Sequence, residues 1–262
     1  HQKEIMGAFL TLYTFAGVIL LVIHGGLCVD IIGGSEVPPH SRPFMALITR
    51  SGSAVCGGAL IKENWVLTAA HCEVNQCEVV LGAHSVKRRE REKQTFQIKK
   101  QIRHPDYKPC SKENDLMLLQ LSGRAKINAA VKVIQVPNSG DDVQPGTVCT
   151  VAGWGLTDIR RKRHSDTLRE VNVTVINRKT CNDAKHYNKN PVITENMICA
   201  GDKTGKKDSC KGDSGGPLRC QNVMRGITAF GKPNKCGTAD GPGVYTRLTK
   251  QYIHWIKKTI RG

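Results

Sequence analysis

The chain has 262 residues and a formal net charge of +17 at pH 7, from 39 Lys and Arg against 22 Asp and Glu. Apolar residues make up 39% of it and no internal repeat or long low-complexity linker interrupts it, so a single globular unit with a sizeable core is the simplest organisation. Its 11 cysteines exclude a typical cytosolic protein and indicate disulfides, and because none forms a CxxC pair, there is no zinc-binding motif.

The first predicted element is an apolar leader that follows a short polar tail. It is apolar from Ala8 to Ile23 and ends in small residues, which fits a secretory signal peptide with a Gly26-x-Cys28 cleavage site. A membrane anchor is the alternative. We therefore expect a signal peptide over residues 1–28, with Met6 as a candidate true start, and a secretory destination.

Basic residues are concentrated in two runs. Removal of residues 1–30 takes away Lys3, Glu4 and Asp30, so the net charge rises from +17 to +18. Such a surface attracts polyanions, and the alternative is a solvated surface that serves solubility. Because nothing resembles a module that reads nucleobases, we expect binding to anionic proteoglycan and no specific nucleic-acid partner. The first run is Lys87, Arg88, Arg89, Arg91, Lys93, Lys99, Lys100 and Arg103, and the second extends from Arg160 to His164.

Several short runs rich in β-branched residues are bounded by Gly, Pro or Asn. Their even spacing favours an all-β barrel or sandwich. Apolar residues from Tyr252 to Ile260 recur at helical spacing, which predicts a C-terminal helix that packs onto the core. The predicted strand segments are Ala46–Thr49, Trp65–Ala69, Glu78–Leu81, Leu116–Leu121, Val148–Ala152 and Val171–Ile176.

Three motifs carry candidate chemistry. His71 lies in LTAAHC at 67–72, and Asp115 opens the apolar run DLMLLQL, where a buried carboxylate needs a partner. Ser214 lies in DSCKGDSGGP at 208–217, whose glycines permit a tight turn that points backbone N–H groups at one spot. In the order His71, Asp115, Ser214 they match the base, the orienting acid and the nucleophile of a catalytic triad.

On these motifs the chain resembles the chymotrypsin-like serine proteases of the trypsin family. The resemblance extends from Ile31 to about Ile260 and includes, in order, IIGG, LTAAHC, DLMLL, GWG at 153–155, GDSGGP and PGVY at 242–245. It implies a serine protease domain over residues 31–262, all-β, with two six-stranded antiparallel β-barrels of the chymotrypsin type and a C-terminal α-helix. Neither a cofactor nor a metal ion is expected.

The resemblance implies a role for each motif residue. A serine hydroxyl is a weak nucleophile at neutral pH, so His71 would take the proton of Ser214 and later give it to the leaving amine. Asp115 would hold the imidazole tautomer and stabilise its charged form. The backbone N–H groups of Gly212 and Ser214 would form an oxyanion hole, each donor worth roughly 3 kcal/mol of the barrier.

The segment IIGG after Val29-Asp30 has two interpretations. It is either the start of a strand or, as the resemblance implies, a new amino terminus. After cleavage before Ile31 the α-amino group would pair with Asp213, and the uncut chain would be inactive. Because Asp30 offers a trypsin-like activator no basic residue, we expect a dipeptidyl peptidase to remove the activation dipeptide 29–30, the route used by granule proteases of lymphocytes and mast cells.

The resemblance also assigns a specificity pocket. Asp208, six residues before Ser214, would form its floor, and Gly231 and Gly243 would leave its mouth open for a long side chain. The carboxylate would pair with Arg or Lys, so cleavage after these residues is expected. The alternative is that Asp208 lies on the surface of a lysine-rich loop.

A finer resemblance is to the granzymes of the A and K type, on the segments IIGGSEVPPHSRPFMA, LGAHS, SDTLREVNVTV and GPGVY. The segment RGITAFGKPNKCG, with Phe230, favours the granzyme A type. This implies a granule-stored or secreted endopeptidase of cytotoxic lymphocytes, with a role in cytolysis, protein substrates and serpin-type inhibitors. One departure is Ala229, where the family usually has a serine that hydrogen-bonds the triad acid.

Two other functions stay open. A catalytically inactive homologue would act as a cationic polyanion-binding protein, although the presence of all three triad residues argues against it. The other is a tryptase-like or digestive secreted trypsin, against which Asp30 and the high positive charge argue.

The remaining cysteines and one sequon complete the expectations. Cys77 and Cys110 either pair with each other or leave Cys110 to join two chains in a disulfide-linked homodimer, although the cysteine of the granzyme A dimer is a few residues displaced from Cys110. Asn172-Val173-Thr174 is a glycosylation sequon in a predicted strand, and the alternative is an unmodified Asn172. The disulfides implied by the resemblance are Cys56–Cys72, Cys149–Cys220, Cys181–Cys199 and Cys210–Cys236.

Overall fold

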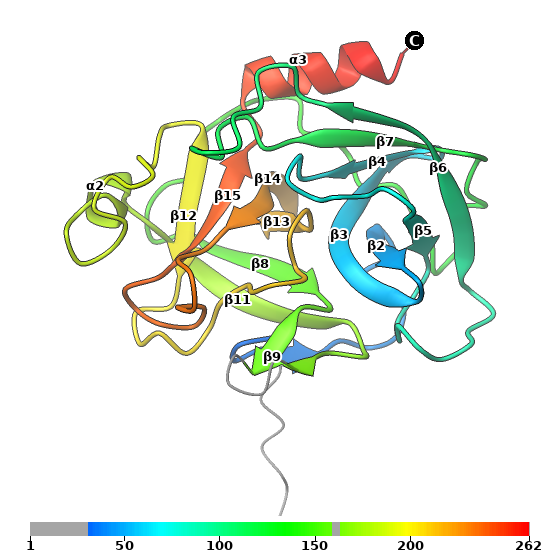
Figure 1. Cartoon of the computed structure of the whole chain (residues 1–262), viewed down its shortest axis with the longest axis horizontal. Helices are drawn as coiled ribbons and strands as arrows, with labels where there is room; N and C mark the ends of the chain where they lie inside the picture. Colours follow the sequence, from blue (N-terminus) through cyan, green and yellow to red (C-terminus); the bar gives the residue numbers. More distant parts are fainter. Residues whose placement is uncertain (1–30, 159–162, 262) are drawn as a thin grey trace, which may run out of the picture.

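A computed structural model describes residues 31–158 and 163–261 of the chain. Two closed antiparallel β-barrels lie side by side, with a helix at the C-terminus (Figure 1). The all-β, two-barrel architecture expected from the sequence is therefore confirmed. The expected signal peptide, the dipeptide 29–30 and the basic residues 160–162 lie outside the described residues.

The first barrel lies on the right of Figure 1 and closes in the strand order β2-β3-β4-β7-β6-β5. Ala46 of β2 illustrates the closure, because it lies opposite Gly58 of β3 on one side and Leu81 of β5 on the other. The strands are β2 (Met45–Arg50), β3 (Ser53–Lys62), β4 (Trp65–Thr68), β5 (Glu78–Leu81), β6 (Gln94–Arg103) and β7 (Met117–Leu121).

The second barrel has the strand order β11-β12-β15-β14-β13-β8 and closes because β8 pairs with β11 as well as with β13. The short strand β1 (Ser35–Glu36) pairs with β11, and the hairpin of β9 (Leu156–Asp158) and β10 (Arg163–His164) follows β8. The barrel strands are β8 (Val148–Gly153), β11 (Arg169–Ile176), β12 (Met197–Gly201), β13 (Pro217–Cys220), β14 (Val223–Phe230) and β15 (Gly243–Arg247).

Side-chain burial alternates along the strands because successive side chains point to opposite faces. In β11, Val171, Val173 and Val175 are buried, and the side chains between them are more exposed. In β6 most residues are polar and exposed, and its apolar side chains are only partly buried against the first-barrel core. Strand β6 therefore lacks the apolar run by which β2, β4, β5 and β7 were predicted, and β3 was not predicted either.

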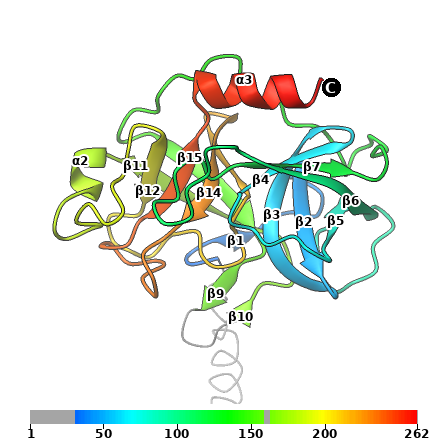
Figure 2. The ribbon, with the colours of Figure 1, turned by 45° about the horizontal axis from the view of Figure 1, so that its top comes forward.

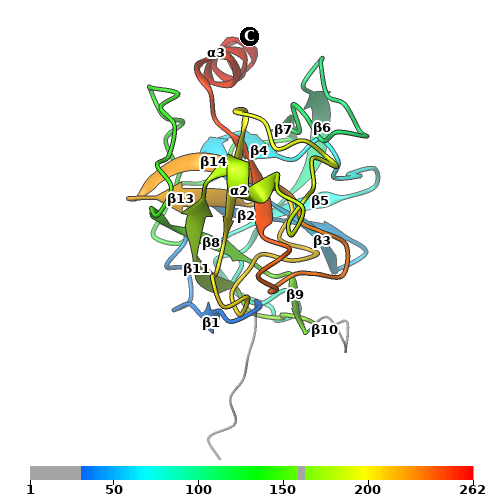
Figure 3. The same ribbon diagram turned by 90° about the vertical axis from the view of Figure 1, so that its left-hand side faces the viewer.

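The predicted C-terminal helix is confirmed as α3 (Lys250–Thr259), which runs from the second barrel across the end of the first (Figures 1 and 2). Thr249 caps it, because its hydroxyl accepts a hydrogen bond from the N–H of Tyr252. Ile253 and Ile256 are buried in the same cluster as the first-barrel core. A short helix, α2 (Arg178–Cys181), lies on the outer side of the second barrel (Figure 3).

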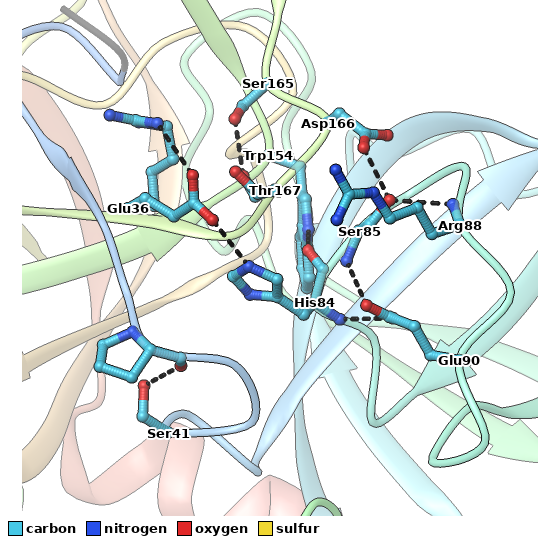
Figure 4. A network of polar contacts seen from close by, with 12 residues as sticks. Glu36, Ser41, His84, Ser85, Arg88, Glu90, Trp154, Ser165, Asp166 and Thr167 are labelled. Carbon is cyan, nitrogen blue, oxygen red and sulfur yellow. Dashed lines mark hydrogen bonds and ion pairs between the residues drawn. The ribbon is translucent and has the colours of Figure 1, made fainter. Parts of the chain in front are cut away.

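His84 lies at a buried junction between the barrels (Figure 4). This residue follows β5 of the first barrel, and its Nε2 is 2.9 Å from Oε1 of Glu36 in β1. Its carbonyl accepts hydrogen bonds from Nε1 of Trp154, at 2.9 Å, and from the N–H of Leu168, at 2.8 Å, both in the second half of the chain. These bonds fix the two barrels relative to each other, so they also fix the spacing of residues that each barrel contributes to the cleft between them.

Candidate active site

His71 and Asp115 both come from the first barrel, His71 just after β4 and Asp115 just before β7. The Nδ1 of His71 donates to Oδ2 of Asp115 at 2.6 Å, and the backbone N–H of His71 donates to Oδ1 at 2.8 Å. Asp115 is fully buried. The two bonds orient the imidazole and keep the proton on Nδ1, so Nε2 is left free to accept a proton.

Ser214 comes from the second barrel, in the turn that precedes β13. Its carbonyl accepts a 2.8 Å hydrogen bond from the N–H of Gly57 in β3, which ties this turn to the first barrel. Ser214 and His71 line the same cavity, whose volume is about 220 Å³. The structure thus brings together all three residues that the sequence motifs single out.

The turn before Ser214 presents two free backbone donors. The N–H of Asp213 donates to the carbonyl of Cys210 at 3.0 Å, and Gly212 within this turn has φ +99°, a conformation that favours glycine. A Cβ on Gly212 would lie 2.9 Å from the Cα of Gly155. The N–H groups of Gly212 and Ser214 donate to no acceptor among the described residues, so both are available to a substrate oxyanion.

Asp213 lies in this turn and is fully buried. Its Oδ1 accepts from the N–H of Gly155 at 2.8 Å and its Oδ2 from the N–H of Cys210 at 2.9 Å. Burial raises the pKa of Asp213 to about 6, because no cation among the described residues compensates its charge. The carboxylate of Asp213 is therefore buried with two backbone donors and no cationic partner among the described residues.

The segment that begins at Ile31 already contacts the second barrel. The side chain of Ile31 is fully buried, and the carbonyl of Ile32 accepts a 3.0 Å hydrogen bond from the N–H of Asp208. A Cβ on Gly33 would lie only 2.0 Å from the carbonyl oxygen of Lys206. The start of the predicted protease domain is therefore packed against the loop that carries Asp208.

Asp208 is 2% exposed and has one unsatisfied oxygen. Its Oδ2 accepts a 3.0 Å hydrogen bond from the N–H of Gly237, whereas Oδ1 has no partner among the described residues. Burial raises the pKa of this carboxyl to about 7. An unpaired buried carboxylate oxygen is costly, so a partner for Oδ1 would stabilise this site. The alternative that Asp208 lies on the surface is wrong.

The two expected wall glycines have different surroundings. A Cβ on Gly243 would lie 2.9 Å from Oδ1 of Asp208, so any larger residue would contact the unpaired oxygen. A Cβ on Gly231 would meet no atom within 4 Å, and Gly231 lines the cavity that contains Ser214. Gly231 thus lines the cavity beside Ser214, whereas Asp208 and Gly243 lie next to each other and are not among the residues that line it.

Ala229 is buried and lines the same cavity. Among the described residues, both hydrogen bonds to the side chain of Asp115 come from His71. The hydroxyl of Thr246 donates to the backbone carbonyl of Asp115 at 3.4 Å and does not reach its carboxylate. The methyl group of Ala229 thus leaves the acid with no donor from β14.

The structure contains the four disulfides that the resemblance implied. The expected alternative of a Cys77–Cys110 pair is wrong, because both thiols are free: Cys77 is buried in the first-barrel core and Cys110 is exposed. Cys77 is also held by its own turn, where its Sγ donates to the carbonyl of Asn75 at 3.6 Å. Asn172 is exposed on β11, and its Oδ1 accepts from the hydroxyl of Thr150 at 3.1 Å.

The cavity is also lined by three lysines, Lys112, Lys211 and Lys232. The motif analysis did not assign them to the site. Two of them could have been found by position, since Lys112 lies three residues before Asp115 and Lys211 directly precedes Gly212.

Among residues 31–158 and 163–261, no group of His, Cys, Asp and Glu side chains could hold a metal ion. Within the same residues, no helix has the length and apolar character needed to cross a bilayer.

Comparisons with known proteins agree with this geometry. The family described as Trypsin matches residues 31–256. Granzyme A of Bos taurus is 53% identical over 255 residues, which cover 95% of this chain and 97% of that protein. Granzyme B(G,H) of Mus musculus is 44% identical over 236 residues, 89% of this chain and 92% of that protein. The solved structure of neuropsin, a serine protease expressed in the limbic system of mouse brain, matches with a TM-score of 0.79 at 36% identity and covers 87% of this chain and 98% of that chain.

Proposed function

Because this chain belongs to the trypsin family of serine proteases and is homologous to granzyme A, we propose that it is an endopeptidase that cleaves proteins after Arg or Lys. One observation supports the specificity: the Oδ1 of Asp208 is buried, has no partner among the described residues and lies next to Gly243. A guanidinium or ammonium group of the substrate supplies the missing partner. Its positive charge offsets the cost of burying the carboxylate.

The catalytic steps follow from the atoms that face the cavity. The Oγ of Ser214 attacks the substrate carbonyl carbon while Nε2 of His71 takes its proton, and the oxygen that becomes negative is held by the N–H groups of Gly212 and Ser214. Collapse breaks the C–N bond, and His71 returns the proton to the leaving amine. Water then adds to the acyl-enzyme through the same base and releases the acid.

Activation is proposed to occur by cleavage before Ile31. The new α-ammonium group would supply the cation that Asp213 lacks in the uncut chain. The existing contact between Ile32 and Asp208 supports this proposal, because the segment needs no long displacement to reach the second barrel. Removal of residues 29–30 suits a dipeptidyl peptidase, since Asp30 is acidic.

The homology to granzyme A supports storage in cytotoxic granules, with a cytolytic role, anionic proteoglycan as a storage partner and serpin-type inhibitors. The net charge of +17 favours that storage over a tryptase-like or digestive trypsin. The exposed thiol of Cys110 is available to a second chain for a disulfide-linked homodimer. The exposed Asn172 is accessible to a glycan.

Mass-spectrometric mapping of cleaved bonds tests the proposed specificity. A chain that begins at Ile31 is incubated with a diverse peptide mixture, and its Ser214→Ala variant is the matched control. Cleavage after Arg and Lys, absent in the control, is the expected result. Cleavage after other residues would overturn the assignment of Asp208, and an absence of cleavage together with no labelling by a fluorophosphonate would favour the cationic binding protein.

A further inference from the structure

The cavity beside Ser214 is lined by three lysines and by no carboxylate among the described lining residues. We propose that Lys112 and Lys211 are specificity-determining residues that select substrates with an acidic side chain beside the Arg or Lys at the cleaved bond. This inference rests on the proposed tryptic function and deepens it, because it names the class of sequence around the cut.

Lys112 is placed by a rigid turn. Its N–H donates to the carbonyl of Lys108 at 2.8 Å, and its φ of +58° is unusual for a residue with a side chain. The nearest carboxylate in sequence, Glu113, is paired with Nζ of Lys108 at 3.0 Å. The ammonium group of Lys112 therefore faces the cleft with no anionic partner among the described residues.

Lys211 is held by the turn that precedes Ser214. Its carbonyl accepts a 2.8 Å hydrogen bond from the N–H of Leu156, and the next residue is Gly212, one of the two oxyanion donors. The side chain is exposed and makes no ion pair among the described residues. A second unpaired ammonium group is therefore attached directly to the turn that holds the reacting carbonyl.

Lys232 provides a contrast within the same cavity. Its Nζ donates to the carbonyl of His186 at 2.8 Å and lies 3.9 Å from Oδ2 of Asp240. Its charge is therefore already compensated by the protein. The proposal is limited to Lys112 and Lys211 for this reason.

Electrostatics gives the expected preference. A substrate arginine that enters this cavity meets two unpaired ammonium groups, and each repels it. A carboxylate on a neighbouring substrate residue cancels that repulsion and pairs with one of the lysines. The interaction free energy of exposed charge pairs is small. We therefore expect an acidic residue to raise kcat/KM by about two- to tenfold, and this gain should shrink at high salt.

Matched peptides test the inference. Each peptide has one arginine. A Glu or its neutral isostere Gln occupies either the position directly before the arginine or the position directly after it. Values of kcat/KM are compared for the parent enzyme, Lys112→Ala, Lys211→Ala and the double variant. Lys179→Ala, which removes an exposed lysine of α2 far from the cleft, is the control for the general charge of the protein. A fluorophosphonate titration normalises each preparation to its fraction of active enzyme.

The parent enzyme and the Lys179→Ala variant are expected to prefer Glu over Gln at one or more positions. Each single cleft variant should lose part of the preference, and the double variant should cut both peptides equally. Equal cleavage by the parent enzyme, or a preference that survives in the double variant, would overturn the inference while leaving the tryptic function intact. If no arginine peptide were cut at all, the proposed function itself would fail and the inference with it.

Discussion

The backbone N–H of Gly237 donates a 3.0 Å hydrogen bond to Oδ2 of Asp208, whereas no donor among residues 31–158 and 163–261 reaches Oδ1. Oδ2 is therefore satisfied by the protein, and Oδ1 is buried without a hydrogen-bond partner. We expect this arrangement to lower the stability of the free protein and to favour a bound cation. The same residue should consequently show opposite effects in stability and in activity.

Replacement of Asp208 by Asn should stabilise the protein at alkaline pH. Burial raises the pKa of Asp208 from 3.8 to about 7, so the folded state binds this proton more tightly than the unfolded state does. Stability contributed by the protonated form is thus fully present below pH 4 and is lost as pH rises through 7. Since one pKa unit corresponds to about 1.4 kcal/mol, the gain in the variant should reach a few kcal/mol at pH 8 and vanish near pH 4. Urea unfolding at both pH values measures it.

The same variant should lose activity. Removal of one partner of a buried charge pair costs roughly 2–5 kcal/mol, so kcat/KM for an arginine ester should fall by about 30-fold or more at pH 8. Undiminished hydrolysis of that ester by Asp208→Asn would contradict the pocket assignment, whatever the variant's stability.

Glu36 and His84 give a pH dependence of the opposite sign. The hydrogen bond from His84 is the main cause that lowers the pKa of Glu36. This carboxylate therefore contributes stability above its unfolded pKa, and the contribution is lost as pH falls through its folded pKa. Glu36 is half exposed, so Glu36→Gln should cost less than about 1 kcal/mol at pH 7 and nothing in strong acid. Glu195→Gln, at an exposed position, is the matched control. An equal loss of unfolding free energy in that variant would contradict the role assigned to the hydrogen bond from His84.

Ala229→Ser should improve catalysis. The carboxylate of Asp115 receives hydrogen bonds only from His71 among the described residues, and the family usually has a serine at position 229 that donates to this acid. A new donor should hold Asp115 more firmly and raise kcat by about two- to tenfold with little change in KM. Steady-state kinetics on an arginine substrate checks this expectation. An Ala229→Ser enzyme with a lower kcat would show that the methyl group fits better than a hydroxyl.

Cys110 should determine the oligomeric state. Its exposed thiol can reach a second chain, whereas Cys77 is buried, so non-reducing electrophoresis should show a dimer that Cys110→Ser abolishes and Cys77→Ser retains. A monomer band for the parent chain would remove the disulfide-linked dimer.

The sequence was informative where a motif combines glycines with chemically active residues. DSCKGDSGGP is such a motif and points to Ser214 and Asp208, whereas the motifs of His71 and Asp115 contain no glycine and were informative through their order before Ser214. Strand β6 was not predicted, because most of its residues are polar and exposed and it contains no apolar run. Whether the thiol of Cys77 is free depends on how the chain packs in three dimensions, and the spacing of the cysteines in the sequence does not predict this. The lysines of the cleft were missed as a group because loops far apart in the chain bring them together.

The most direct test of the central claim compares two chains, one beginning at Ile31 and one at Val29, on an arginine or lysine thioester. Hydrolysis is expected from the Ile31 form alone, since only its α-amino group can pair with Asp213. Equal hydrolysis by the Val29 form would contradict activation by the new amino terminus. Hydrolysis by neither form, with Ser214 left unlabelled by a fluorophosphonate, would contradict the enzyme itself.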